Sequence, residues 1–207
     1  MTYPACQNLN TPSTSVTGLL LLYTGSPSHP DPARVAAYLR EFLMDPCVMD
    51  MPRWLRGALV KGVIVPLRAR KSAAKYQSIW MTEGSPLTWH TQCLREALRE
   101  QLPECFIASG AAYGSEPLQE SLAVLVKASL RRLVVFPLFP HYARATRGSL
   151  RMLLDAALHR LGADTLDLCE VPPFYAHPAY LEAMYKAVFP ALEAFHPDHV
   201  VFSYHGL

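Results

Sequence analysis

The feature that most constrains the fold is an alternation between apolar runs and amphipathic stretches. The run SVTGLLLLYTGSP, residues 15–27, is apolar until glycine and proline break it, which is typical of a buried parallel strand that ends in a loop. The next stretch, DPARVAAYLREFL (31–43), repeats apolar residues at helical spacing. Asp31 and Pro32 suit the N-cap and the first turn of that helix. The chain therefore begins with a strand followed by a helix.

The same alternation returns in the second half of the chain. Strands are expected at 104–114, 131–140, 164–174 and 199–207, and helices at 118–130, 149–162 and 179–195. Pro190 is expected to disturb the last of these helices. Alternating units of this length predict an α/β fold, in which a mostly parallel sheet carries helices on both faces and the crossovers are right-handed.

Composition excludes several classes of protein. A chain of 207 residues, of which 51% are hydrophobic, can bury a sizeable core, and its net charge of +2 is too small to indicate a nucleic-acid partner. There is no G-x-G-x-x-G motif after the first strand and no P-loop, which argues against a nucleotide-dependent enzyme. Five cysteines without a C-x-x-C pair argue against a zinc site and a disulfide framework. With no secretory leader and no apolar run of about 20 residues, a cytoplasmic location is expected.

Ligands of parallel α/β sheets bind beyond the carboxyl ends of the strands, so the loops at that edge are candidate functional segments. His205 follows the strand-like run VVFSY and precedes Gly206, which allows the backbone to turn close to a ligand. An imidazole whose ordinary pKa is about 6.5 can accept a proton near neutral pH or bind a metal ion. On the residue pattern alone, a histidine that only hydrogen-bonds a neighbouring loop is an equally good interpretation.

Residues 51–80 do not alternate in this way and mix apolar with basic side chains. One interpretation is a packed helix with a solvated basic face. The other is an apolar, cationic lip that accepts a flat ligand bearing carboxylates, or that rests on an anionic membrane surface. Arginine suits a carboxylate ligand because its planar fork matches both oxygens.

Several stretches resemble the ferrochelatase family, whose enzymes insert ferrous iron into a porphyrin. The most specific are E-G-S-P-L at 83–87 and F-S-Y-H-G-L at 202–207. The others are GLLLLYTGSP, YLREFLMDPCVMDMPRWLRG, IVPLRARKSAAKYQSIW, AAYGSEPLQESL and VVFPLFPHYARATRGS. Because these stretches occur in the family's order along nearly the whole chain, together they are more specific than any single one.

The resemblance implies two similar Rossmann-like α/β domains that enclose a porphyrin cleft. Residues 17–207 correspond to the first domain, with a helical porphyrin-lip insertion at about 47–90 and a disordered leader at 1–16. The second domain is missing from this sequence, together with the glutamate that faces the family's histidine across the cleft. We therefore expect a fragment of a longer enzyme.

The implied activity is that of a lyase, a metal chelatase that inserts Fe²⁺ into protoporphyrin IX, releases two protons and forms protohaem in haem biosynthesis. Alternatives are coproporphyrin III as the substrate, a related chelatase that inserts cobalt into sirohydrochlorin, and a non-catalytic porphyrin- or haem-binding fragment. No tightly bound cofactor and no iron–sulfur cluster are expected, and Fe²⁺ is a substrate. Peripheral membrane contact is expected through 51–65.

The resemblance also assigns site residues. His205 is implied as the catalytic residue, acting as iron ligand or proton acceptor beside the porphyrin nitrogens. Arg68 is implied to pair with a propionate. Tyr76, Ser85 and Thr24 are implied to line the cleft or bond the porphyrin rim. Two positions depart from the family pattern, because Ala112 stands where many members carry Arg or Lys, and His141 stands where Gln is frequent.

Overall fold

Four parallel strands form the sheet of the structure, a computed structural model that describes residues 17–128 and 130–203. The strands are β1 (Thr17–Ser26), β2 (Cys105–Gly114), β3 (Arg132–Pro137) and β4 (Asp167–Glu170). Their order across the sheet is β2-β1-β3-β4, and every neighbouring pair is parallel. The predicted α/β fold is therefore confirmed. The segment expected as a leader, 1–16, lies outside the described residues.

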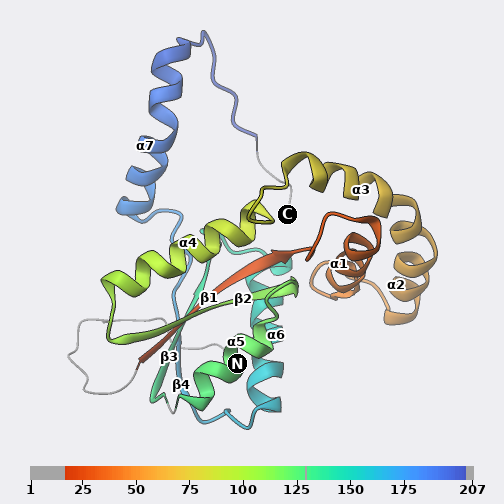
Figure 1. The fold of residues 1–207 in the computed structure, drawn as a ribbon, viewed down its shortest axis with the longest axis vertical. Coiled ribbons are helices and arrows are strands. Elements are labelled where there is room, and N and C mark those ends of the chain that lie inside the picture. Colours follow the sequence, from red (N-terminus) through yellow and green to blue (C-terminus); the bar gives the residue numbers. More distant parts are fainter. Residues whose placement is uncertain (1–16, 129, 204–207) are drawn as a thin grey trace.

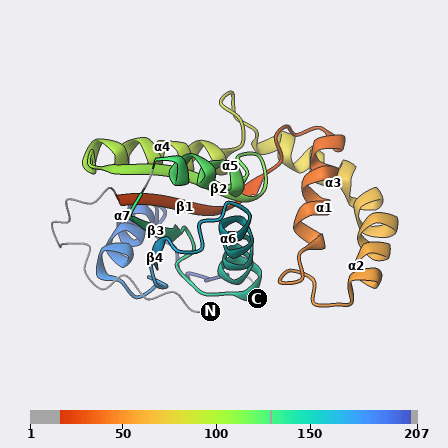
Figure 2. The same ribbon diagram turned by 90° about the horizontal axis from the view of Figure 1, so that it is seen from below.

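Helices cover both faces of this sheet. They are α1 (Pro32–Met44), α2 (Arg53–Leu59), α3 (Val65–Ile79), α4 (Pro86–Gln101), α5 (Leu118–Lys127), α6 (Ser149–Arg160) and α7 (Pro178–Phe195), with π-helical turns at η1 (Val60–Ile64) and η2 (Arg144–Gly148). Figures 1 and 2 show α4 on one face of the sheet and α6 on the other. Helix α5 packs on the same face as α6.

The central strand β1 explains why its sequence is a continuous apolar run. Side chains alternate between the two faces of a strand, and both faces here are covered. Leu20 and Leu22 pack into the core beneath α5 and α6, whereas Leu19 and Leu21 pack into the core beneath α4. Burying all four leucines contributes on the order of 6–12 kcal/mol before entropy is counted.

Helix α1 begins as the sequence predicts. The Asp31 carboxylate accepts hydrogen bonds from the backbone N–H groups of Ala33 at 2.8 Å and Arg34 at 3.0 Å, and Pro32 occupies the first turn. These bonds satisfy donors that a helix start leaves without partners. The buried face of α1, with Val35 and Leu39, packs against α3 rather than against the centre of the sheet.

Helices α2, η1 and α3 follow one another without a break, and we call residues 53–79 the helical arm. The junction residues keep right-handed helical torsion angles. Pro66 gives a physical reason for the wider turn at η1, because a proline has no N–H group and its ring would clash with the carbonyl of Gly62 in a regular α-helix. Figure 1 shows the arm beside α1, beyond the end of β1.

The strand predicted at 199–207 is wrong for its described part. Residues 199–203 belong to no strand, and Val201 is 88% exposed. The cause lies in the preceding helix, because α7 has no buried residue and therefore does not return the chain to the edge of the sheet. Helix α7 also continues through Pro190, which was expected to disturb it. Residues 204–207 lie outside the described residues.

Two further features were not predicted. The sequence pattern gave no separate helix at 86–101, where α4 packs on β1 and β2. Cys169 takes part in a disulfide, although the cysteine spacing argued against a disulfide framework. Across the described residues, none of the helices combines the length and apolarity needed to cross a bilayer.

Candidate functional site

The candidate site lies at the carboxyl end of β1, where the loop after β1, helix α1, the helical arm and the start of α4 lie close together (Figure 1). A tight approach of two strands shapes this edge. Gly25 has φ +92, and a Cβ atom there would lie 1.9 Å from the carbonyl oxygen of Tyr113 on β2. Only glycine fits, because it combines an accessible left-handed conformation with the absence of a side chain.

Thr24 and Ser85 both lie at this edge. Thr24 is half-buried, one residue before Gly25 in β1. Ser85 is buried and is the N-cap residue of α4, although its side chain makes no capping hydrogen bond. A tight turn places it there, with Gly84 N–H donating to the Met81 carbonyl at 3.1 Å and Met81 N–H donating to the Gly84 carbonyl at 2.9 Å. The Ser85 hydroxyl is therefore not committed to helix capping.

Tyr76 belongs to a cluster of aromatic rings. Its ring packs edge to face against Tyr38 and against Trp80, with 6.3 Å and 6.4 Å between the ring centroids. Burial raises the pKa of Tyr76, and burial likewise raises the pKa of Tyr38. Both phenols therefore stay protonated near neutral pH, so the cluster combines the buried, uncharged ring of Tyr38 with the half-buried, uncharged ring of Tyr76.

Arg68 lies two turns before Tyr76 on α3, about 12 Å along the helix axis. Its side chain is exposed, and the ion pairs of the described residues do not include it. The sequence-predicted Arg68 and Tyr76 are thus carried by one rigid helix, and Thr24 and Ser85 by the adjoining strand end and helix start. An unpaired guanidinium on an exposed helix face is available to an anionic ligand.

The rest of the arm has two contrasting faces. Its inner face, with Val60, Val65 and Ala73, is buried against α1. Its outer face exposes Trp54 to 75% and Leu67 to 74%. The packed helix of the first interpretation is confirmed for the inner face. The outer face is apolar and cationic, and its role as a lip for a ligand or a membrane stays a prediction.

A groove of about 540 Å³ opens on that outer surface, lined by Trp54, Arg53, Lys61 and Met44 among others. Arg56 does not line this groove, although it is one of the basic residues of the helical arm. Its side chain is buried and donates to the carbonyl oxygens of Met49 at 3.1 Å and Met51 at 3.2 Å. Arg56 therefore holds the segment before the arm in place.

A buried hydrogen-bond network behind the aromatic cluster joins three elements. The Tyr113 hydroxyl donates to Asp45 Oδ2 at 2.6 Å, and the Ser149 hydroxyl donates to the same oxygen. Burial, and secondly the hydrogen bond to Asp45, raises the pKa of Tyr113. The end of α1, the end of β2 and the start of α6 are fixed relative to one another by this network.

A second network at the same edge was missed by the sequence reasoning. Glu116 has φ 58 and accepts hydrogen bonds from the Tyr23 hydroxyl at 2.9 Å, from Gln92 Nε2 at 2.5 Å and from the Ser109 hydroxyl at 3.2 Å. It ties the β2–α5 loop to β1 and to α4. The sequence gave no sign of this network, because the partners of Glu116 come from distant parts of the chain.

The loops after β3 and β4 are joined as well. The Arg147 side chain is 2% exposed and donates to Glu170 Oε1 at 2.7 Å, to the Phe139 carbonyl at 3.2 Å and to the Val171 carbonyl. His141 stacks on Tyr175 across the two loops, at 5.0 Å between ring centroids. The structure thus brings His141 to the carboxyl edge of the sheet. It lies in the loop after β3, against the loop after β4, and not at the end of β1.

His205, the implied catalytic residue, lies outside the described residues, so the structure does not place it. The described histidines, cysteines and carboxylates form no group of three that could hold a metal ion. The side chains that the structure does place at this edge are a guanidinium, neutral phenol rings and a hydroxyl that makes no capping bond, beside an apolar, cationic helical arm.

The parallel sheet and the site beyond its strand ends define the chain as an α/β domain of the chelatase type, with a helical arm over its carboxyl edge. A family model described as Ferrochelatase matches residues 16–207. The chain belongs to the ferrochelatase family.

Similar proteins agree with this assignment. The chain is 38% identical over 193 residues to a ferrochelatase of Coxiella burnetii (strain Dugway 5J108-111), covering 92% of this chain and 52% of that protein. It is 37% identical over 193 residues to a ferrochelatase of Yersinia enterocolitica, covering 92% of this chain and 59% of that protein. It is 34% identical over 190 residues to a coproporphyrin III ferrochelatase of Lactiplantibacillus plantarum, covering 92% of this chain and 56% of that protein. The chain thus spans a little over half the length of these relatives.

Proposed function

We propose that this protein takes part in inserting Fe²⁺ into protoporphyrin IX, the last chemical step in forming protohaem. The proposal is supported by Thr24 and Ser85 at the carboxyl edge of the sheet and by Arg68 and Tyr76 on the adjoining helix α3, in a chain that belongs to the ferrochelatase family. As in other parallel α/β sheets, this edge is where a ligand binds.

In this proposal the helical arm binds the porphyrin and sets its orientation. The Arg68 guanidinium pairs with a propionate, while Trp54 offers apolar surface to the ring edge. Tyr76 and Ser85 contribute hydroxyls to the rim. Because α3 packs against α1 and the buried networks hold α1 to the sheet, these contacts form a rigid surface.

Metal insertion requires more than binding. A free porphyrin is flat and carries two pyrrole N–H protons, so the ring must bend, the protons must leave and Fe²⁺ must lose water. Remote contacts such as those of Arg68 can supply the roughly 1–5 kcal/mol that distortion of the ring costs. We assign His205 the role of accepting one proton or ligating the iron as it enters, with the second proton passing to solvent. The balance is Fe²⁺ plus free porphyrin giving metalloporphyrin plus two protons.

Protoporphyrin IX is proposed over coproporphyrin III on the chemistry of the arm. Protoporphyrin has two propionates and two vinyl groups, whereas coproporphyrin has four propionates. The most exposed side chains of the arm include apolar Trp54, which suits vinyl and methyl edges better than two further carboxylates. One relative is named a coproporphyrin III ferrochelatase and others are named ferrochelatase without a substrate, so substrate competition is the decisive comparison.

The test is anaerobic addition of Fe²⁺ to the protein with protoporphyrin IX, followed by the absorbance change of metallation, with coproporphyrin III and sirohydrochlorin with Co²⁺ as parallel substrates. We expect metallation of protoporphyrin and its loss in His205→Ala. A Soret shift on binding without metallation supports a non-catalytic porphyrin-binding protein instead, and turnover of sirohydrochlorin alone overturns the proposal.

The remaining features follow from the same proposal. The lip is proposed as an insertion at about 47–90, and its apolar residues at 51–65 as the contact with a membrane surface. No resident cofactor, iron–sulfur cluster or nucleic-acid partner is proposed, and the location is proposed to be the cytoplasm. Co-sedimentation with anionic vesicles, compared between the wild type and Trp54→Ser, tests the membrane contact.

A further inference from the structure

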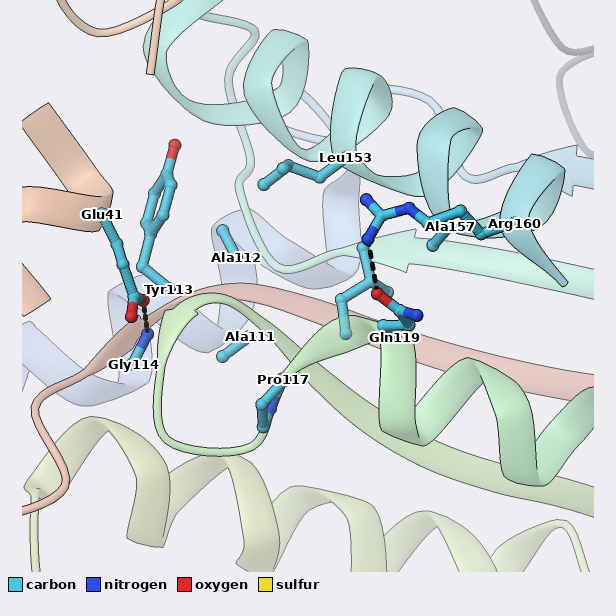
Figure 3. Close-up of a pocket in the computed structure, with 11 residues that line it drawn as sticks. Glu41, Ala111, Ala112, Tyr113, Gly114, Pro117, Gln119, Leu153, Ala157 and Arg160 are labelled. Atoms are coloured by element: carbon cyan, nitrogen blue, oxygen red, sulfur yellow. Dashed lines mark hydrogen bonds between the residues drawn. The ribbon is translucent and has the colours of Figure 1, made fainter. Parts of the chain in front are cut away.

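A second cavity lies beside the candidate porphyrin site, at the carboxyl end of β2. It has a volume of about 500 Å³ and opens between α6 and the turn from β2 into α5 (Figure 3). None of Thr24, Arg68, Tyr76 and Ser85 lines it. Its volume is within the range of small-molecule sites, roughly 300–1,000 Å³.

The middle of the cavity is apolar and built from small side chains. Figure 3 shows Leu153 and Ala157 of α6 above Ala111 and Ala112 of β2. The three alanines leave the space open that longer side chains would fill. An apolar cavity of this size favours a ligand with a hydrophobic body of about 10–15 heavy atoms.

The two ends of the cavity carry opposite charges. At one end Arg160 donates from Nη1 to Gln119 Oε1 at 2.7 Å and from Nε to the Ala156 carbonyl at 3.1 Å. Both partners are neutral, and the ion pairs formed by residues 17–128 and 130–203 do not include Arg160. The guanidinium keeps its charge and unused N–H groups, so it is ready to pair with an anion at that end.

At the other end stands Glu41 of α1. Its Oε2 accepts a hydrogen bond from the Gly114 backbone N–H at 2.8 Å, which holds the carboxylate beside the cavity. A negative charge there repels an anion and favours a neutral or hydrogen-bond-donating end of a ligand. The two ends together therefore select both the charge and the direction of the ligand.

We propose that this cavity is a binding site for a small organic monocarboxylate, with the carboxylate on Arg160, the apolar body over Ala112 and Ala157, and the uncharged end toward Glu41. A dicarboxylate of the same length binds more weakly, because its second charge meets Glu41. The site uses none of the four residues assigned to porphyrin binding.

Calorimetric titration of the protein with three rigid probes tests the proposal. The probes are 2-naphthoate, its neutral isostere 2-naphthamide, and 2,6-naphthalenedicarboxylate. We expect 2-naphthoate to bind at least fivefold more tightly than either of the other two. Arg160→Gln should remove this preference over the amide, and Glu41→Gln should strengthen binding of the dicarboxylate about fivefold. Arg131→Gln, which changes an exposed arginine outside the cavity, is the matched control and should change nothing.

Filling the cavity with a larger side chain gives a second test, which does not depend on charge. Ala157→Leu should abolish 2-naphthoate binding, and Ala112→Leu, at a half-buried position, replaces it if the first variant does not fold. The proposal is overturned if 2-naphthoate does not bind the wild type. It is also overturned if Arg160→Gln and the folded cavity-filling variant bind 2-naphthoate as the wild type does, because binding is then at another apolar surface, such as Trp54 and Leu67.

Discussion

The Tyr113 hydroxyl donates to Asp45 Oδ2 at 2.6 Å, joining residues that are 68 positions apart in the sequence. This bond connects the end of β2 to the end of α1. It matters for function because α1 is the surface against which the helical arm packs, and the arm carries Arg68 and Tyr76. The position of the candidate site therefore depends on a buried hydrogen bond outside it.

Removing the Tyr113 hydroxyl should weaken the whole assembly. Tyr113→Phe leaves the Asp45 carboxylate with one fewer donor in a buried setting, so the free energy of unfolding should fall by about 1–3 kcal/mol. Urea unfolding followed by circular dichroism measures it. Tyr175→Phe, whose ring is 52% exposed, is the control and should change stability by less than about 0.5 kcal/mol. Equal stability of the two variants would show that the bond carries no structural role.

Glycine at position 25 should be irreplaceable. In Gly25→Ala the new methyl group would lie 1.9 Å from the Tyr113 carbonyl oxygen, and the backbone there has a left-handed φ. We therefore expect the free energy of unfolding, measured with urea, to fall by about 3 kcal/mol or more. Gly84→Ala is the matched control, because Gly84 also has a positive φ but nothing within 4 Å of a Cβ atom. Its cost should be about 1–2 kcal/mol, from the backbone alone. A smaller loss for Gly25→Ala than for Gly84→Ala contradicts the close approach.

Much of the fold could be predicted because its signals are local. The continuous leucine run of β1 and the cap at Asp31 are read within a few residues, and both are confirmed. Helix α4 was missed as a separate element because its first residues, up to about 90, were assigned to the helical insertion at about 47–90. Its start at Ser85 and Pro86 and the partly buried Leu98 near its end were available as signals.

The site could be predicted only in part, for a physical reason. Arg68 and Tyr76 came from a sequence resemblance, and the structure places both on α3. Glu116 and Asp45 have no local signal, since each acts through partners that are distant in the sequence. The strand at 199–207 was predicted from composition alone, whereas a strand also requires a neighbour to pair with, and α7 does not bring its described part to one.

Two acidic residues of the same strand should differ sharply in importance. Glu170 neutralises Arg147, whose side chain is 2% exposed, so Glu170→Ala leaves a buried charge and should cost about 3 kcal/mol. Asp167 pairs with Arg132 at the surface, with side-chain exposures of 55% and 43%, so Asp167→Ala should cost less than about 1 kcal/mol. Thermal and urea unfolding of both variants measure the two losses in the free energy of unfolding. Losses of similar size would contradict the predicted difference between Glu170 and Asp167.

The cap of α1 should make stability depend on pH in acid. The Arg34 backbone N–H, followed by that of Ala33, holds the pKa of Asp31 below its ordinary value of 3.8 in the folded protein. A lowered folded pKa means that the ionised cap stabilises the fold fully above the unfolded pKa, and that this contribution is lost as the pH falls through the folded pKa.

Asp31→Asn tests this dependence because asparagine caps a helix without titrating. The wild type should be the more stable protein at pH 6, and its advantage over Asp31→Asn should shrink as the pH falls toward 3. The measurement is the urea midpoint of both proteins at each pH. An advantage that stays constant over this range would mean that Asp31 does not titrate with folding.

The most direct test of the proposed site is fluorescence titration of protoporphyrin IX with the protein and two variants of Arg68. We predict that Arg68→Ala weakens binding about tenfold and that Arg68→Lys restores little of it, because an ammonium lacks the planar fork that matches a propionate. Arg40→Ala, which changes an exposed arginine of α1, should bind as the wild type does. Unchanged porphyrin affinity in Arg68→Ala would contradict the placement of the porphyrin on the helical arm.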